Sequence, residues 1–129
     1  MKLKRAGANC VSTYIPWNWH MPRENLIDFD DKYRDWSIPD YFSKKLNEFL
    51  DIANNMGLKV IARPGPYICS EWDSGGHPNW LYVKTRKLRS LDPAYINYAM
   101  KWYDAVMPII ANYAEKDIVK VVQVENEYF

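Results

Sequence analysis

Two glutamates in this chain follow apolar runs that could form buried strands of a parallel sheet. Asn126 and Glu127 close the run VVQVENEYF, and Glu71 closes LKVIARPGPYICSE. Pairs of carboxylates cleave glycosidic bonds: one protonates the leaving oxygen, and in retaining enzymes a second, about 5–5.5 Å away, attacks the sugar. These residues therefore indicate half of a sugar-cleaving site, in which Glu127 could supply the acid.

Aromatic side chains are dense in the chain, which has six Trp and ten Tyr. Sugar rings stack their C–H faces on aromatic rings, but the same side chains also fill hydrophobic cores, so composition alone favours neither use. We expect half of the following tryptophans to be core residues and half to line a site: Trp17, Trp19, Trp72 and Trp80.

The second carboxylate could come from this chain or from elsewhere. Glu71 and Glu127 would lie about 4.8 Å apart if they ended neighbouring parallel strands. Glu125 shares a strand face with Glu127 by alternation. We favour a source outside the chain, because carboxylates on one side of a sugar rarely straddle it. Glu125 is then expected to be a polar interior residue, with Arg63 as its ion-pair partner.

Helical and extended patterns alternate along the first half of the chain. Residues 1–7 are typical of a helix end, and residues 8–15 of a strand. A helix is predicted next, because residues 37–40 have capping-box spacing and Gly57 provides a stop signal. Its predicted apolar face is Phe42, Leu46, Phe49, Leu50, Ala53 and Met56.

The same alternation continues in the second half. A strand is predicted over 58–63, followed by a long loop over 64–91 that begins with Pro-Gly-Pro. Asp92 is a candidate helix cap, and Pro108 should kink the helix that follows. The last strand is predicted over 118–125. The predicted buried stripe of that helix is Ile96, Met100, Tyr103, Met107, Ile110 and Ala114.

This element order predicts parallel strands joined by helical crossovers. Two architectures fit: an open doubly wound sheet and part of a (β/α)8 barrel. An open sheet usually has a Gly-rich turn after its first strand, whereas this chain continues with TYIPWNWHMP. Polar and aromatic residues follow all three predicted strands, at the edge where barrel enzymes hold their catalytic groups. The sequence therefore favours a piece of a barrel.

Composition excludes several classes of function. The net charge is +1 and the basic residues are scattered, which argues against nucleic acid as a partner. No apolar stretch approaches the roughly 20 residues of a membrane span. His20 and His77 stand apart, so no metal site is expected. Cys10 is expected to be a buried free thiol. No secretory signal is visible; because the chain is expected to begin inside a domain, its compartment stays open, with the cytoplasm slightly favoured.

Four motifs together resemble the family 35 glycoside hydrolases, the β-galactosidases: TYIPWNWHMP, GPYICSEW, GGHPNWL and QVENEY. The resemblance covers nearly the whole chain, in the order and spacing of that family. It implies an α/β fold, specifically a partial (β/α)8 TIM barrel of strands two to four and helices two and three. Residues 1–129 would then be a single, incomplete catalytic domain.

The resemblance also implies roles for individual residues. Glu127 matches the general acid/base, and Asn126 matches a residue that hydrogen-bonds the sugar 2-hydroxyl. The other positions that match galactose-binding residues are Tyr14, Cys69, Ser70 and Glu71. The family's nucleophile lies on strand seven, and nothing in this chain matches it. The implied substrate is a β-galactoside, with no cofactor.

The chain also departs from the family pattern. Met21 stands where the family usually has Glu, and Ser70 where it usually has Ala. A closed barrel needs about 250 residues, so we expect a fragment of a retaining β-galactosidase that is inactive without the missing half of the barrel. Two alternatives stay open: a non-catalytic fragment that binds galactosides or a partner half, and another barrel glycosidase of the same clan, with β-glucosidase or β-mannosidase preference.

Overall fold

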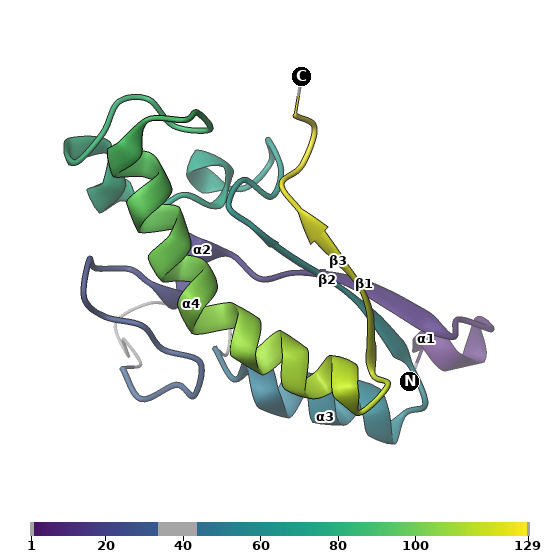
Figure 1. Cartoon of the computed structure of the whole chain (residues 1–129). Helices are drawn as coiled ribbons and strands as arrows, with labels where there is room; N and C mark the ends of the chain where they lie inside the picture. Colours follow the sequence, from purple (N-terminus) through teal and green to yellow (C-terminus); the bar gives the residue numbers. More distant parts are fainter. Residues whose placement is uncertain (1, 34–43, 129) are drawn as a thin grey trace.

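The computed structural model describes residues 2–33 and 44–128. Its centre is a parallel three-stranded sheet in the order β1-β2-β3. The strands are Cys10–Tyr14, Lys59–Gly65 and Val119–Val124. The two longest helices, α3 and α4, pack on the same side of this sheet (Figure 1). They span Leu46–Asn55 and Pro93–Glu115.

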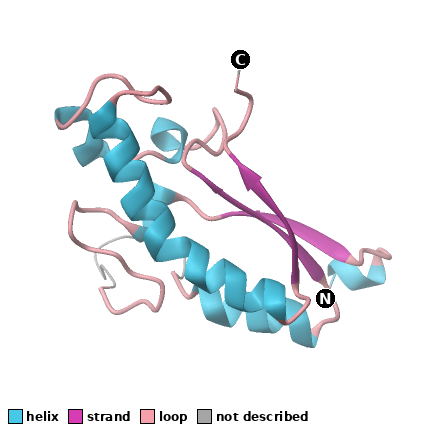
Figure 2. Ribbon diagram, in the orientation of Figure 1, coloured by secondary structure: helices cyan, strands magenta, loops and turns pink. Residues whose placement is uncertain are grey.

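Shorter elements connect these units (Figure 2). α1 spans Lys2–Arg5 and α2 spans Trp17–His20, while two 3-10 turns, η1 and η2, span Asp73–Gly76 and Asn79–Val83. The sequence did not indicate α2 or the two 3-10 turns, because elements of one turn have no measurable periodicity. None of the helices in the described ranges is long and apolar enough to cross a membrane.

The predicted helix ends are largely confirmed. Asp92 caps α4, since its Oδ1 accepts hydrogen bonds from the backbone N–H groups of Ala94 at 3.1 Å and Tyr95 at 3.2 Å. Gly57 has a φ of 63°, the left-handed conformation that closes a helix. The predicted capping box at residues 37–40, and Phe42 with it, lie outside the described residues, and the described helix begins at Leu46.

The central strand is longer than predicted. β2 continues through Pro64 to Gly65, which pairs with Val124 of β3. The prediction ended the strand at Arg63 because proline lacks a backbone N–H. Proline still offers its carbonyl, however, and the indole N–H of Trp102 donates to the Pro64 oxygen at 2.8 Å. The strand therefore passes through proline without leaving this carbonyl unsatisfied.

The buried face of α4 differs from the predicted stripe. Only Ile110 of the predicted set is fully buried, while Ile96 and Met100 are 40% and 51% exposed. The buried residues are Tyr95, Ala99, Trp102, Val106, Ile110 and Tyr113. Both sets have helical spacing, so periodicity could not choose between two adjacent apolar faces. The long-range bond from Trp102 to Pro64 holds the observed face against the sheet.

The α/β class and the parallel sheet agree with the sequence prediction, and the described strands are compatible with part of a barrel. β1 and β3 are both edge strands within the described residues. Pro108 lies inside α4, which the structure describes as one helix from Pro93 to Glu115.

The core can be tested with a matched pair of leucines. Leu50 of α3 is 0% exposed, whereas Leu91 is 91% exposed. Leu50→Ala should lower the free energy of unfolding by about 2–5 kcal/mol, because it removes packed methyl groups and leaves a cavity. Leu91→Ala should change it by less than about 0.5 kcal/mol. Chemical denaturation of a folded protein that contains this chain measures both, and equal effects would contradict the described packing.

Candidate functional site

The segments that follow the three strands are joined by hydrogen bonds. Asn18, which follows β1, accepts from the indole N–H of Trp72 at 2.9 Å and donates to the carbonyl of Asp73 at 3.1 Å. The backbone N–H of Tyr67, which follows β2, donates to Glu125 Oε1 at 3.1 Å. The carboxyl ends of parallel strands thus meet at one edge, where ligands bind in α/β folds.

A line of contacts crosses this edge from Tyr14 to Asn126. The guanidinium of Arg63 lies 4.4 Å from the ring centroid of Tyr14. Arg63 also donates from Nη2 to Asn126 Oδ1 at 2.5 Å, and Gln123 donates to the same oxygen at 3.0 Å. Two sequence-predicted site residues, Tyr14 and Asn126, are therefore brought together through an arginine of the central strand.

Glu125 pairs with Arg89 rather than with the predicted partner Arg63. Arg89 Nε and Nη2 each approach Glu125 Oε2 at 3.0 Å. The prediction assumed that strand alternation continues through Glu127, but β3 ends at Val124 and Glu125 has a φ of 63°. Sequence reasoning missed Arg89, which no local pattern singles out in the long loop.

The two predicted sugar-contacting carboxylates are both on the surface. Glu127 and Glu71 are exposed, and within the described ranges neither carboxylate has a hydrogen bond or an ion pair. The backbone carbonyl of Glu127 accepts from Arg89 Nη2 at 3.1 Å. Glu71 lies well beyond the end of β2 at Gly65. The 4.8 Å spacing of neighbouring strands therefore cannot be applied to Glu71 and Glu127, as the sequence argument had assumed.

The loop after β2 depends on two consecutive glycines. Gly75 and Gly76 have φ angles of 62° and 90°. A Cβ on Gly75 would lie 2.1 Å from the ring of Tyr67, and one on Gly76 would lie 2.8 Å from the side chain of Ile68. The loop also closes through Ile68 N–H, which donates to the Gly75 carbonyl at 2.9 Å. Close packing thus explains the Gly-Gly pair of the GGHPNWL motif.

Among the other predicted site residues, Cys69 is buried and Ser70 is exposed. Cys69 and Cys10 are both free thiols. Cys10 is only half-buried, which corrects the expectation of a buried thiol; it begins β1, an edge strand of the sheet in the described residues.

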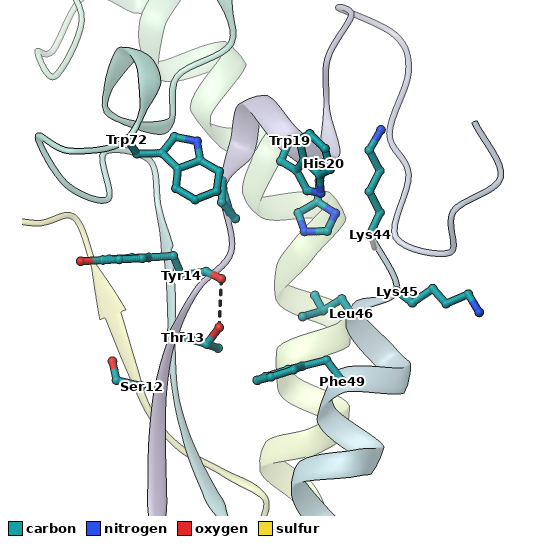
Figure 3. Close-up of a pocket in the computed structure, with 11 residues that line it drawn as sticks. Ser12, Thr13, Tyr14, Trp19, His20, Lys44, Lys45, Leu46, Phe49 and Trp72 are labelled. Atoms are coloured by element: carbon teal, nitrogen blue, oxygen red, sulfur yellow. Dashed lines mark hydrogen bonds between the residues drawn. The ribbon is translucent and has the colours of Figure 1, made fainter. Parts of the chain in front are cut away.

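Tryptophans line a pocket of about 400 Å³ between β1, α2 and the start of α3. Figure 3 shows Tyr14, Trp19 and Trp72 around this space. Trp17 is fully buried, and Trp80 packs against the core. Of the four tryptophans considered from the sequence, Trp17 and Trp80 therefore pack in or against the core, whereas Trp19 and Trp72 line this pocket.

Both histidines are buried hydrogen-bonding residues. Burial lowers the pKa of His20 and of His77 to about 4. His20 Nδ1 lies 2.8 Å from the Asp28 carbonyl, and His77 Nε2 lies 3.1 Å from the Tyr95 hydroxyl. Both rings are therefore neutral at pH 7. In the described part of the chain, no group of three His, Cys, Asp or Glu residues could hold a metal ion.

Asp28, in the loop after α2, is a buried carboxylate. Its carboxylate accepts backbone N–H bonds from Asp30, Lys32 and Tyr33 at 3.0–3.1 Å. Burial opposes ionisation, but the three donors outweigh it and the pKa of Asp28 is lowered. This carboxylate therefore organises the loop after α2.

Comparison with known proteins identifies the family of this chain. The model of glycosyl hydrolases family 35 matches residues 1–129. The chain belongs to this family. It is 40% identical to the β-galactosidases of Felis catus and Homo sapiens over 99% of its length, and 41% identical to an exo-β-D-glucosaminidase of Pyrococcus horikoshii over 87% of its length.

This family 35 chain spans less than a fifth of the relatives it matches: 18% of the two β-galactosidases and 16% of the exo-β-D-glucosaminidase. The resemblance of its motifs to family 35 is thus confirmed. In sequence, the chain resembles the β-galactosidases of this family.

Proposed function

We propose that this chain forms strands two to four and helices two and three of the barrel of a retaining β-galactosidase, which removes terminal β-D-galactosyl residues. The observation that carries the proposal is the meeting of Tyr14, Arg63 and Asn126 at the carboxyl edge of the sheet, with Glu127 next in the chain. In a family 35 protein, this edge is the expected place for the sugar.

Glu127 is the proposed general acid/base, and its exposed carboxylate has no competing partner in the described ranges. It would protonate the departing glycosidic oxygen and then deprotonate the incoming water. Asn126 would hydrogen-bond the sugar 2-hydroxyl, and Tyr14 would contact the ring. Cys69, Ser70 and Glu71 would hold other galactose hydroxyls through backbone and carboxylate groups, with Ser70 and Glu71 exposed for this purpose.

The nucleophile must come from outside this chain. A retaining enzyme needs a second carboxylate about 5–5.5 Å from the acid/base, on the other side of the anomeric carbon. Within the described residues Glu125 is committed to Arg89 and to the Tyr67 N–H, which leaves it poorly placed to attack a sugar. The partner that completes the site is therefore the remaining part of the barrel, and the proposed reaction uses no cofactor.

The isolated chain should not hydrolyse galactosides. It contributes the acid/base without the nucleophile, and within the described residues both outer strands of its sheet are edge strands, which favour association or aggregation. Purified chain should give no turnover above buffer with a chromogenic β-galactoside. Robust turnover would contradict the proposed division of the site. Equilibrium binding of galactose without turnover, even after the barrel is completed, would favour the alternative of a non-catalytic binding fragment.

In a full-length enzyme that contains this chain, Glu127→Gln should reduce kcat/KM for an alkyl β-galactoside by at least about 100-fold, because a poor leaving group needs a proton. With a dinitrophenyl β-galactoside, whose leaving group needs no proton in the first step, kcat/KM should fall much less. Steady-state kinetics with both substrates measures the difference, and Glu71→Gln is the carboxylate control. An unchanged rate with the alkyl substrate would refute the assignment.

A second candidate function follows from the relative in Pyrococcus horikoshii, whose name is exo-β-D-glucosaminidase. Galactosides and glucosaminides differ at C2 and C4, so contacts to those substituents decide between them. We expect the full-length enzyme to prefer a β-galactoside over the matching β-glucosaminide by at least about 100-fold in kcat/KM, since unpaired buried polar groups reject the wrong sugar. A panel with both substrates and the β-glucoside measures this, and preference for the glucosaminide would reverse the assignment.

A further inference from the structure

Arg89 donates three hydrogen bonds to the turn after β3. Its Nε donates to Glu125 Oε2 at 3.0 Å. Its Nη2 donates to the carbonyl oxygens of Asn126 at 2.6 Å and Glu127 at 3.1 Å. One rigid guanidinium thus fixes three consecutive residues of the chain, and two of them are the proposed sugar-contacting residues.

The backbone of this turn needs such support. Glu125 and Glu127 have φ angles of 63° and 47°, in the left-handed region that residues with a Cβ rarely adopt. Conformations of this kind persist where neighbouring groups over-determine them. Further supports come from β2 and the residue after it, where the Gly65 carbonyl accepts from Glu125 N–H at 2.9 Å and Tyr67 N–H donates to the Glu125 carboxylate. Arg63 of β2 and Gln123 of β3 both donate to Asn126 Oδ1, and Gln123 also donates to the Glu125 carbonyl at 3.2 Å.

Arg89 is itself held in place by aromatic rings. Its guanidinium lies 3.9 Å from the ring centroid of Tyr67 and 5.5 Å from that of Tyr128. The Tyr67 ring in turn occupies the space left by the missing side chain of Gly75. A lysine could carry the charge, but it has no planar group to stack and to bind three acceptors in a fixed fork.

We propose that Arg89 is a positioning residue that sets the direction in which Asn126 and Glu127 are presented to the sugar. It acts through the main chain and through Glu125, and it need not touch substrate. This inference rests on the proposed acid/base role of Glu127. A displacement of about 1 Å in a reacting group can cost about 100-fold in rate. Loss of the hydrogen bonds from the Arg89 guanidinium should therefore affect proton donation by Glu127 most.

The test compares Arg89→Met, Arg89→Lys and Arg86→Met in a full-length family 35 enzyme that contains this chain. Such an enzyme can be built by exchanging the matching segment of the feline β-galactosidase. Arg86 is exposed in the same loop and has no contact with the turn among the described residues, so its variant is the matched control. The readout is kcat/KM for an alkyl and for a dinitrophenyl β-galactoside.

For Arg89→Met we expect kcat/KM to fall about 100-fold with the alkyl substrate and at least about tenfold less with the dinitrophenyl substrate. The kcat/KM of Arg89→Lys should lie between those of the wild type and Arg89→Met, and the kcat/KM of Arg86→Met should equal that of the wild type. Equal losses with both substrates, or no loss, would overturn the proposal. If Arg89→Met does not fold, the same comparison is decided on Arg89→Lys.

Failure of the proposed function can be told apart from failure of this inference. If Glu127→Gln shows no dependence on the leaving group, the acid/base assignment fails by itself. Backbone hydrogen exchange over residues 124–128 then decides the role of Arg89, because a positioning residue should slow exchange there. Exchange that rises in Arg89→Met but not in Arg86→Met supports the proposal, and unchanged exchange overturns it.

Discussion

Parallel pairing of the central strand β2 with both of its neighbours is the constraint on which the rest of this structure depends. β2 pairs with β1 from Cys10–Lys59 to Tyr14–Arg63, and with β3 as far as Gly65–Val124. Because all three strands run the same way, the segments that leave them converge at one edge. Residues far apart in the sequence, such as Arg63 and Asn126, can therefore share a hydrogen bond. α4 is joined to β2 by a hydrogen bond from the indole N–H of Trp102 to the Pro64 carbonyl, which helps to hold the helix against the sheet.

The features that the sequence predicted well are those with local causes. Asp92 before Pro93 marks a helix start, and Gly57 marks a helix end, because each acts on backbone groups within a few residues. The buried face of α4 has no local cause, since Ile96 and Tyr95 begin two apolar stripes of equal spacing. Which stripe is buried depends on the partner surface, and the indole of Trp102 finds its acceptor on β2.

The same distinction separates the predictable from the unpredictable parts of the site. The motif residues Tyr14, Asn126 and Glu127 could be placed at the sheet edge because each follows an apolar run. The partner of Glu125 could not be predicted from the sequence, because Arg89 lies 36 residues away in a loop. The course of that loop depends on the packing of Gly75 against the Tyr67 ring and of Gly76 against its own neighbour. Only the packed loop brings that guanidinium to the end of β3.

The two glutamates that flank Asn126 have different environments: Glu125 pairs with Arg89, whereas Glu127 is exposed. On a continuing strand, Glu125 and Glu127 would point the same way and would repel one another. The left-handed φ of Glu125 ends that alternation. Its carboxylate forms an ion pair with Arg89 and accepts a hydrogen bond from the Tyr67 N–H, whereas the carboxylate of Glu127 stays exposed. The hydrogen bonds that Glu125 accepts occupy both of its carboxylate oxygens, which suits anchoring of the turn. The proposed assignment of the chemistry to Glu127 and of the anchoring to Glu125 is supported by their different partners as well as by their positions.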